Sequence, residues 1–456
     1  MFARALSLFC YPPPGRNPSS SSSGGSIVDV PIMKASVAIL ALALLAEGAV
    51  HGPRVESAPS VKGNREGKTF SLAQVPNQNF KGLDVPAAFM KAHLRYGDAL
   101  PAALSRAVKK DPALMTKFKA LSPQVGETGT VQATPAEKFD SEYVVPVGFG
   151  TPPQVINVNL DTGSADLWVF SSKTNKQSVN GQTLYRPEDS STAALQQNYT
   201  WSIKYGDESG ASGVVYKDRV QVGQTYFDQQ AVEAAVDVSQ EIAADSFASG
   251  ILGLSMSRAN TVKPKAQLTY MDNIKKDLAM PVFTSNLRSQ QPGNYNFGYI
   301  NQSEYSGQIQ YAKIDPQSPY WKVSLTGYQV GNSTGDFKAL PWNAIVDTGT
   351  SLLLAPEDIL KGYWGQVRGA AVDDKGMYVF PCEQTLPDFY FGIGQYRGFV
   401  PGAYINYGKV NDSTCFGGIQ TSDKIGFAIL GDVLLKAQFV VFDLGAMTVG
   451  FANKNL

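Results

Sequence analysis

Histidine is almost absent from this chain, which has two in 456 residues, His51 and His93. Residues 129–456 therefore contain none. This absence excludes from that region a Ser-His-Asp triad, a Cys-His nucleophile pair and a His-x-x-x-His zinc site. Whatever chemistry these residues perform, it has to use other side chains.

An excess of either charge is also missing overall, with 39 basic and 39 acidic residues, but the two signs are unevenly distributed. Residues 1–128, here called the leader, contain 15 Lys and Arg against 8 Asp and Glu, whereas residues 129–456 contain 24 against 31. The acidic balance of the longer part gives no support to nucleic-acid binding. A basic leader before an acidic body predicts that the leader docks on the body electrostatically.

Long hydrophobic runs are missing as well. The apolar run at 37–45 is too short to span a bilayer, and no apolar tail ends the chain, so neither a membrane span nor a lipid anchor is indicated. The run follows Met33-Lys34 and precedes small residues, which is the form of a secretory signal peptide at 33–48. We therefore expect a secreted, extracellular protein, and interpret residues 1–32 as a disordered extension or a misassigned start.

The most informative pattern that is present occurs twice. Apolar residues lead into Asp-Thr-Gly-Ser at 161–164 and into Asp-Thr-Gly-Thr at 347–350. An apolar-apolar-Gly pattern ends 92 residues after the first aspartate, at 250–253, and 84 residues after the second, at 428–431. One such turn could be a solvated strand end. Two halves that share both patterns in the same order indicate a duplicated domain, whose facing lobes would bring the two carboxylates together.

Asp161 and Asp347 could then work as a pair. Two carboxylates a few ångströms apart in a poorly solvated cleft share one proton, because they cannot both ionise easily. The ionised partner would take a proton from a water molecule, and the protonated partner would donate to a carbonyl oxygen. The nucleophile is water, so neither a metal nor an organic cofactor is implied, and activity is expected to be highest in acid.

With these motifs, the chain over about residues 130–456 resembles the pepsin-like aspartic proteases, specifically the secreted fungal branch of aspergillopepsin- and penicillopepsin-type endopeptidases. The resemblance implies an all-β, bilobal fold with two pseudo-twofold-related lobes, 129–310 and 311–456, and a central cleft covered by a β-hairpin flap. It implies a monomeric acid endopeptidase that cuts polypeptide substrates with broad specificity, apolar residues flanking the cut, and that is made as a zymogen.

The resemblance also assigns roles around the two aspartates. Hydroxyls would orient the carboxylates or hold the two turns together, and the adjacent glycines complete the turns; these supporting residues are Thr162, Gly163, Ser164, Thr348, Gly349 and Thr350. The flap would contribute Tyr205, Gly206 and Asp207, with Asp207 admitting Lys before the cut. Trp168 would bond the flap tyrosine. Simpler interpretations remain open, because Asp207 could be a solvated turn residue and Trp168 a core residue.

Residues 49–128 correspond in the resemblance to an inhibitory propeptide that binds the dyad within the same chain. Helical patches are expected at 86–97 and 101–121. The family usually places Lys-Tyr at the inhibitory position, and here the nearest match is Arg95-Tyr96. Either cation could pair with the carboxylates near neutral pH, and acid would loosen that contact.

Two kinds of covalent modification are expected. Cys382 and Cys415 are predicted to form a disulfide that closes an excursion of the second lobe, the alternative being two reduced thiols. Four Asn-x-Ser/Thr triplets are glycosylation candidates in a secreted chain, namely Asn198, Asn301, Asn332 and Asn411.

Hydrophobic spacing predicts two helical packing faces. One comprises Leu268, Met271 and Leu278, and the other comprises Ile359, Tyr363 and Val367 in the segment 356–367.

Two rival functions remain at this point. One is a non-catalytic peptide-binding protein on the same fold, although such relatives typically lose an aspartate or an active-site glycine. The other is a glycosidase that uses two carboxylates with water between them. Neither rival would cleave peptides.

Overall fold

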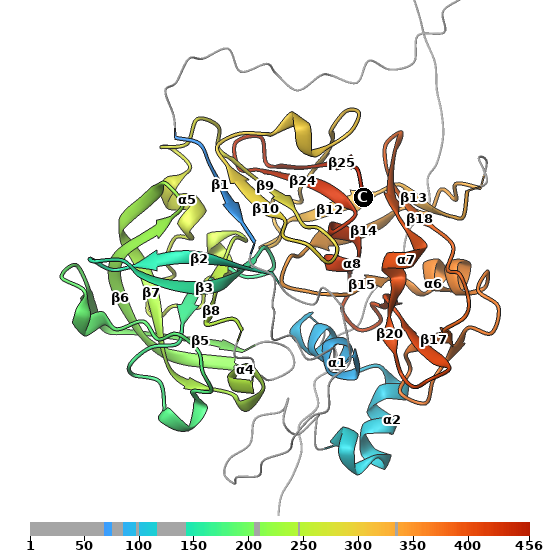
Figure 1. Ribbon diagram of the computed structural model, residues 1–456, viewed down its shortest axis with the longest axis horizontal. Coiled ribbons are helices and arrows are strands. Elements are labelled where there is room, and N and C mark those ends of the chain that lie inside the picture. The colour runs from blue at the N-terminus through green and yellow to red at the C-terminus, as the bar shows by residue number, and fades with distance from the viewer. Residues whose placement is uncertain are drawn as a thin grey trace, which may run out of the picture. The chain divides into compact units, whose positions relative to one another are not determined.

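The computed structural model describes residues 68–74, 85–96, 100–115, 143–204, 210–244, 247–332 and 336–456. All of them belong to one compact unit, Asn64–Leu456. The expected signal peptide and the extension before it lie outside the described residues. Strands far outnumber helices (Figure 1), as expected for an all-β fold.

The first half of the body forms a seven-stranded sheet, coloured green to yellow-green in Figure 1. Asp161 is the last residue of β3. In spatial order the strands are β2 (Val144–Phe149), β3 (Gln154–Asp161), β8 (Gly250–Gly253), β4 (Leu167–Val169), β7 (Thr225–Val238), β6 (Gly210–Val222) and β5 (Ala194–Lys204).

The second half forms a five-stranded sheet around the same motif. In spatial order its strands are β12 (Lys322–Leu325), β14 (Trp342–Val346), β23 (Ala428–Leu430), β15 (Leu353–Ala355) and β22 (Ile419–Thr421). In the first half β8 pairs parallel with β3 and antiparallel with β4. In the second half β23 pairs parallel with β14 and antiparallel with β15. The repeated patterns at 250–253 and 428–431 are thus the central strands of two equivalent motifs, which confirms the duplication.

A six-stranded sheet joins strands from both halves. In spatial order it contains β1 (Phe70–Ala73), β10 (Asn294–Phe297), β9 (Val282–Asn286), β24 (Gln438–Asp443), β25 (Thr448–Asn453) and β11 (Gln310–Lys313). Phe283 stacks on Phe442 with ring centroids 4.5 Å apart, and Trp321 meets both rings edge-on. This aromatic packing links strands that are far apart in the sequence. The edge strand β1 belongs to the leader.

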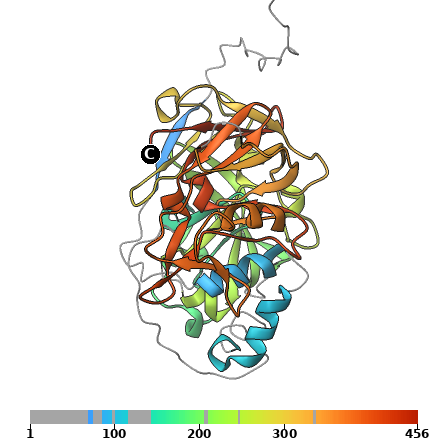
Figure 2. The ribbon, with the colours of Figure 1, turned by 90° about the vertical axis from the view of Figure 1, so that its right-hand side faces the viewer.

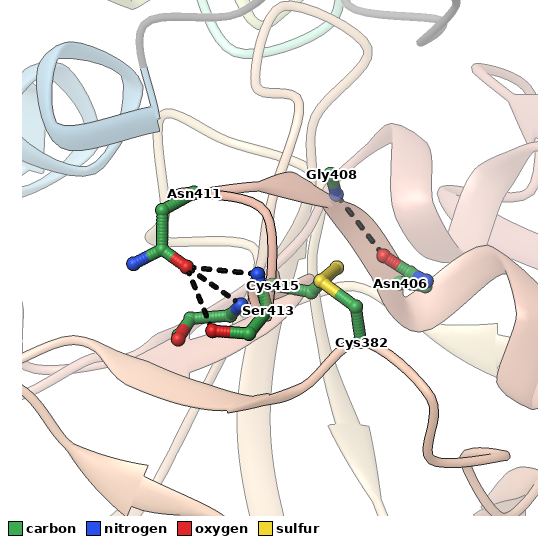
Figure 3. Close-up of a disulfide and its surroundings, with 7 residues drawn as sticks. Cys382, Asn406, Gly408, Asn411, Ser413 and Cys415 are labelled. Atoms are coloured by element: carbon green, nitrogen blue, oxygen red, sulfur yellow. Dashed lines mark hydrogen bonds between the residues drawn. A yellow bond between two sulfur atoms is a disulfide. The ribbon is translucent and has the colours of Figure 1, made fainter.

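Two smaller sheets complete the second half. One comprises β13 (Gly327–Val330), β18 (Phe389–Ile393) and β19 (Tyr396–Val400), and the other comprises β16 (Ala371–Val372), β17 (Tyr378–Pro381), β21 (Thr414–Gly417) and β20 (Asn406–Lys409). A disulfide joins Cys382, directly after β17, to Cys415 in β21 (Figure 3). The predicted pairing is therefore confirmed.

The helices are short. Those outside the leader are α4 (Gln240–Ala244), α5 (Tyr270–Ile274), α6 (Glu357–Trp364), α7 (Gly402–Ile405) and α8 (Asp432–Leu435). Single 3-10 turns occur at Lys176–Ser178, Pro187–Asp189, Ser257–Ala259 and Gln302–Glu304. Among the described residues, no helix combines the length and the apolar character needed to cross a membrane.

Among the described residues of the leader, α1 (Val85–Tyr96) and α2 (Ala102–Lys110) are helices, and residues 112–115 are helical as well. α1 begins one residue before the expected patch 86–97, and α2 with residues 112–115 lies within the expected patch 101–121, of which residues 116–121 are outside the described residues. Figures 1 and 2 both place α1 and α2 at the end of the unit opposite the six-stranded sheet. In Figure 1, α1 lies between the green strands of the first half and the red strands of the second.

One of the two predicted packing faces is confirmed and the other is partly wrong. Ile359 and Tyr363 of α6 are buried, as is Val367 just beyond it. Met271 and Leu278 are buried too, Leu278 beyond the end of α5, but Leu268 is 54% exposed. The helix α5 begins at residue 270, so Leu268 does not lie on its face.

The disulfide yields a stability prediction. Replacing both Cys382 and Cys415 by Ser should lower the free energy of unfolding by about 3–4 kcal/mol, because the bond closes a loop with a sequence separation of 33. Urea unfolding of the protein measures the change against the wild type. An unchanged urea midpoint in the double variant would contradict the prediction.

Candidate active site

The two sequence-predicted aspartates end equivalent strands and meet at the junction of the halves. Asp161 is the last residue of β3, Asp347 follows β14, and both are fully buried. A backbone hydrogen bond ties each aspartate to the neighbouring central strand. The Leu254 amide, just after β8, donates to Asp161 O at 2.8 Å, and the Asp347 amide donates to Leu430 O of β23 at 3.1 Å. Both carboxylates are thus held by strands buried on each side.

Thr162 and Thr348 hold the two turns together by reciprocal hydrogen bonds. The Thr162 amide donates to Thr348 Oγ1 at 3.1 Å, and the Thr348 amide donates to Thr162 Oγ1 at 3.0 Å. Each hydroxyl also donates to a carbonyl of the opposite half, Thr162 to Val346 O at 2.8 Å and Thr348 to Leu160 O at 2.5 Å. These four buried bonds tie residues about 186 positions apart in the chain into one rigid unit.

The carboxylates are oriented by donors from their own turns. The amides of Gly163 and Gly349 donate to the Oδ1 atoms of Asp161 and Asp347 at 2.8 and 2.9 Å. The hydroxyls of Ser164 and Thr350 donate to the corresponding Oδ2 atoms, each at 2.5 Å; all of these are residues predicted from the sequence.

The glycines leave room for the opposite carboxylate. A Cβ on Gly163 would lie 2.4 Å from Asp347 Oδ1, and a Cβ on Gly349 would lie 2.3 Å from Asp161 Oδ1. A side chain at either position would therefore push the two carboxylates apart. The Oδ1 atom of each aspartate faces the turn of the other half.

The two carboxyl groups differ in their proton affinity. Burial favours the neutral form of Asp161, but the Arg95 guanidinium and the hydrogen bonds from its own turn outweigh burial, so the pKa of Asp161 is lowered. Burial raises the pKa of Asp347, and the neighbouring charge of Asp161 adds to this effect against the opposing charge of Arg95. With Arg95 bound, Asp347 therefore holds a proton more readily than Asp161 does.

The leader helix α1 reaches both aspartates. Arg95 Nη2 lies 2.6 Å from Asp161 Oδ2, and Arg95 Nη1 lies 3.8 Å from Asp347 Oδ2 and donates to Gly349 O at 3.3 Å. The Tyr96 hydroxyl donates to Asp347 Oδ2 at 2.5 Å. Burial raises the pKa of Tyr96 well above its usual value, so the hydroxyl keeps the proton that it donates.

Two aromatic residues hold the Tyr96 ring, and no pattern in the sequence pointed to them. Tyr96 meets Tyr320 edge-on at 5.7 Å between ring centroids and Phe427 at 5.8 Å. Both residues come from the second half of the body, outside the Asp-Thr-Gly motifs. Only their adjacency in space, not any local pattern, connects them to the site.

His93 lies on the same helix, two residues before Arg95, and is fully buried. Its ring packs edge-on against Phe89, with centroids 4.6 Å apart. Burial lowers the pKa of His93 from 6.5 to about 4, although the backbone of Thr421 and Asp423 and the Asp423 carboxylate act in the opposite direction. The docked helix therefore favours a neutral imidazole.

The flap prediction is only partly within the described residues. Strands β5 and β6 flank residues 205–209, but Tyr205, Gly206 and Asp207 lie outside the described residues, as does any contact they make with Trp168. The Trp168 side chain is 1% exposed and packs against Phe170 and stacks on Trp201. Its position agrees with the core interpretation.

The glycosylation candidates differ in accessibility. Asn198, Asn332 and Asn411 are exposed, whereas Asn301 is half-buried and its amide nitrogen donates to Glu304 at 2.9 Å. Figure 3 shows Asn411 beside the disulfide, with its side-chain oxygen facing Ser413. That oxygen accepts from the Ser413 amide at 3.0 Å and from the Ser413 hydroxyl at 3.2 Å.

Within the described residues, no group of three or more His, Cys, Asp or Glu side chains could hold a metal ion. The chemistry that the site can perform is proton transfer between two unequal carboxyl groups, with Arg95 and Tyr96 bound to them.

The comparison with known proteins agrees with this geometry. The family model described as eukaryotic aspartyl protease matches residues 142–454. Endothiapepsin of Cryphonectria parasitica is 44% identical over 427 residues, which cover 91% of this chain and 98% of the relative. Penicillopepsin-2 of Penicillium janthinellum is 41% identical, with 86% and 93% covered, and aspergillopepsin-1 of Aspergillus fumigatus is 40% identical, with 87% and 95% covered.

The match spans both halves of the body and both Asp-Thr-Gly turns. Two β lobes related by a repeated strand motif, with one aspartate from each at their junction, form the pepsin-like fold. The chain therefore belongs to the eukaryotic aspartyl protease family and is an aspartic endopeptidase, a hydrolase of peptide bonds.

Proposed function

We propose that the protein is a secreted acid endopeptidase in which Asp161 and Asp347 activate a water molecule against the scissile carbonyl. The observation that carries this proposal is the pair of fully buried carboxyl groups, held in equivalent turns and favouring one shared proton. Family membership favours a peptidase over a glycosidase, and the intact turns favour catalysis over mere binding.

In the proposed mechanism the two aspartates take different parts. The ionised member of the pair accepts a proton from the water, and the protonated member donates to the carbonyl oxygen. Because the two groups are strongly coupled, the titration belongs to the pair, and removal of Arg95 changes both members. The rate should fall as rising pH removes the last shared proton.

We further propose that the leader keeps the chain as a zymogen. The Arg95 guanidinium, with its side chain 7% exposed, neutralises the fully buried Asp161, while Tyr96 occupies Asp347. With these contacts in place, neither carboxylate is available to a substrate carbonyl or a nucleophilic water. Residues 49–128 then act as an intramolecular inhibitor that has to leave before catalysis.

The remaining features of the proposal follow the family resemblance. The substrates are polypeptides lying extended in the cleft, with bulky apolar side chains flanking the cut, and Lys admitted through Asp207. The working form is a monomer without a membrane anchor. Among the four triplets, the exposed Asn198, Asn332 and Asn411 are the glycan acceptors we favour, because the Asn301 amide already donates to Glu304.

The dyad is tested by isosteric substitution. Asp161→Asn and Asp347→Asn should each lower kcat/KM on denatured haemoglobin or casein at acidic pH by roughly a thousandfold or more, because each removes one of the two proton-transfer groups. The exposed Asp189→Asn is the matched control, and a statine-type inhibitor should abolish the wild-type activity. Equal digestion by wild type and either dyad variant would refute the mechanism.

The inhibitory contact is tested at neutral pH. Arg95→Met should raise the rate at which the full chain processes itself near pH 7 by at least about tenfold, because the buried Asp161 loses its cation and the helix loses its charged anchor. Lys91→Met, which removes an exposed cation from the same helix, is the matched control. If both variants stay as inert as the wild type, the inhibitory role of Arg95 is wrong.

The buried His93 should contribute to the release of the leader helix in acid. Its folded pKa of about 4 lies below the ordinary 6.5, so docking is favoured at pH above 6.5 and weakens as pH falls from 6.5 towards 4. The full shift corresponds to about 3 kcal/mol. His93→Gln removes this response and should lower the pH midpoint of self-activation by about one unit.

Self-activation of the full chain is followed by gel shift over a pH series. His51→Gln, at the other histidine of the chain, is the control. An unchanged midpoint in His93→Gln would assign the whole acid response to the carboxylates.

A further inference from the structure

A second carboxyl pair is buried behind the turn that carries Asp161. Asp166 follows five residues later in the chain, and Glu233 lies on β7; each is 1% exposed. The strands β4 and β7 run parallel with Trp168 opposite Glu233, which brings the two acids together. The Asn260 amide nitrogen bonds one oxygen of each acid, so the two carboxyl groups are close neighbours. The mechanism proposed above makes no use of them.

The orientation of Asn260 defines which oxygens of this pair accept hydrogen bonds. Asn260 Oδ1 accepts from the amides of Val262 at 3.2 Å and Gln267 at 2.7 Å. The amide nitrogen must therefore face the acids, and it donates to Asp166 Oδ1 at 3.1 Å and to Glu233 Oε1 at 2.9 Å. These two carboxyl oxygens are acceptors and do not carry a proton.

The two oxygens of each acid differ in their hydrogen bonding. Asp166 Oδ1 accepts two further bonds, both at 2.9 Å, from the amide and the hydroxyl of Thr261. Asp166 Oδ2 and Glu233 Oε2 are buried and make no well-aligned hydrogen bond with a described residue, although the Leu167 amide approaches the Glu233 carboxyl group. Leaving two buried acceptors without a donor is costly, and a single proton between them satisfies both. A carboxylic acid donating to a carboxylate is also a strong, charge-assisted hydrogen bond.

We propose that Asp166 and Glu233 share one proton and act as a positioning pair that holds the Asp161 turn in its catalytic geometry. Loss of this proton at higher pH sets two like charges against each other and loosens the turn. The pair thus places an upper pH limit on the enzyme that is separate from the titration of the dyad. The kinetic part of this inference rests on the proposed function of Asp161, whereas the shared proton does not.

The pair is connected to Asp161 by short steps. Asp166 O accepts from the Gly253 amide at 2.9 Å, and Ser164 O accepts from the Ser255 amide at 2.9 Å. Ser164 in turn donates its hydroxyl to Asp161 Oδ2. A shift of residues 164–166 therefore moves a donor that orients the carboxylate. Neither Asp166 nor Glu233 touches the reacting atoms, so their role is positioning.

The charges that face the pair are those of Asp161 and Lys217. The Asp161 charge acts on Asp166, and the Lys217 ammonium, which donates to Gln267 Oε1 at 2.7 Å, acts on Glu233. Burial raises the pKa of Asp166 and raises that of Glu233 well above 4.5. The folded protein thus keeps a proton that the unfolded chain releases, so stability is present below about pH 4.5 and is lost as pH rises.

The first test measures stability in the full chain carrying Asp347→Asn, which removes the shared proton of the dyad and prevents self-cleavage. Adding Glu233→Gln supplies a permanent N–H donor to Asp166 in place of the shared proton. We expect the fall in thermal midpoint between pH 4.5 and pH 7.5 to shrink by roughly 2–5 °C relative to the same chain with Glu233. Asp237→Asn, an exposed acid on the same strand β7, is the matched control.

A second variant, at the other member of the pair, keeps the test decisive if Glu233→Gln does not fold. Asp166→Asn places the permanent donor on the other partner and should give the same gain at pH 7.5. A gain in either variant but not in Asp237→Asn supports the shared proton. The same fall in thermal midpoint in all variants, or a larger fall in both pair variants, would overturn it.

The second test separates positioning from stability alone. In the chain with an intact dyad, Glu233→Gln should raise the ratio of kcat/KM at pH 6.5 to that at pH 4 by at least about threefold over wild type, mainly through kcat. An unchanged ratio together with the gain in stability would refute the positioning role and leave the shared proton. A wild-type chain without peptide cleavage would refute the proposed function instead, and the stability test would stand unaffected.

Discussion

The reciprocal hydrogen bonds between Thr162 and Thr348 are the constraint on which the rest of the structure depends. Each turn alone is an ordinary strand end, and its aspartate would be free to face solvent. Because each threonine both accepts from and donates to the opposite half, neither turn can move without breaking buried bonds. The cost of leaving such groups unpaired keeps two like charges together that would otherwise separate.

The leader binds to the same pair of buried carboxyl groups. Two buried carboxyl groups attract a cation strongly, and α1 supplies one in Arg95, within 2.6 Å of Asp161. Tyr96 adds a neutral donor to the partner that favours its proton. The aromatic surface of Tyr320 and Phe427 then holds the ring in place. The arrangement that suits catalysis is therefore also the arrangement that binds the inhibitory segment proposed here.

Much of this architecture was predictable because short sequence patterns specify it. The repeated Asp-Thr-Gly turns and the two apolar-apolar-Gly strands predicted the duplication, and the hydroxyls beside each aspartate lie within a few residues of it. Arg95 was singled out by the family resemblance, because Arg95-Tyr96 is the nearest match to the Lys-Tyr that the family places at the inhibitory position. The duplication required only short spacing, whereas the roles of the hydroxyls and of Arg95 required the family resemblance as well.

Other features depend on contacts between distant segments, which a single sequence does not reveal. Asp166, Glu233 and Asn260 are spread over 95 residues, and no motif links them. His93 was visible as one of two histidines, but its burial against Phe89 was not. Leu268 misled the prediction because periodicity was extended across the start of α5, where the backbone is not helical.

The strand β1 affects the stability of the mature enzyme. Phe70 of β1 stacks on Phe297 of β10, with ring centroids 4.6 Å apart, so a piece of the leader completes the edge of a sheet in the body. If the leader departs on maturation, the finished enzyme loses partners that helped it to fold. The lifetime of the mature enzyme is then set by its rate of unfolding and not by its free energy of unfolding. A mature chain that has unfolded lacks the leader and does not refold efficiently.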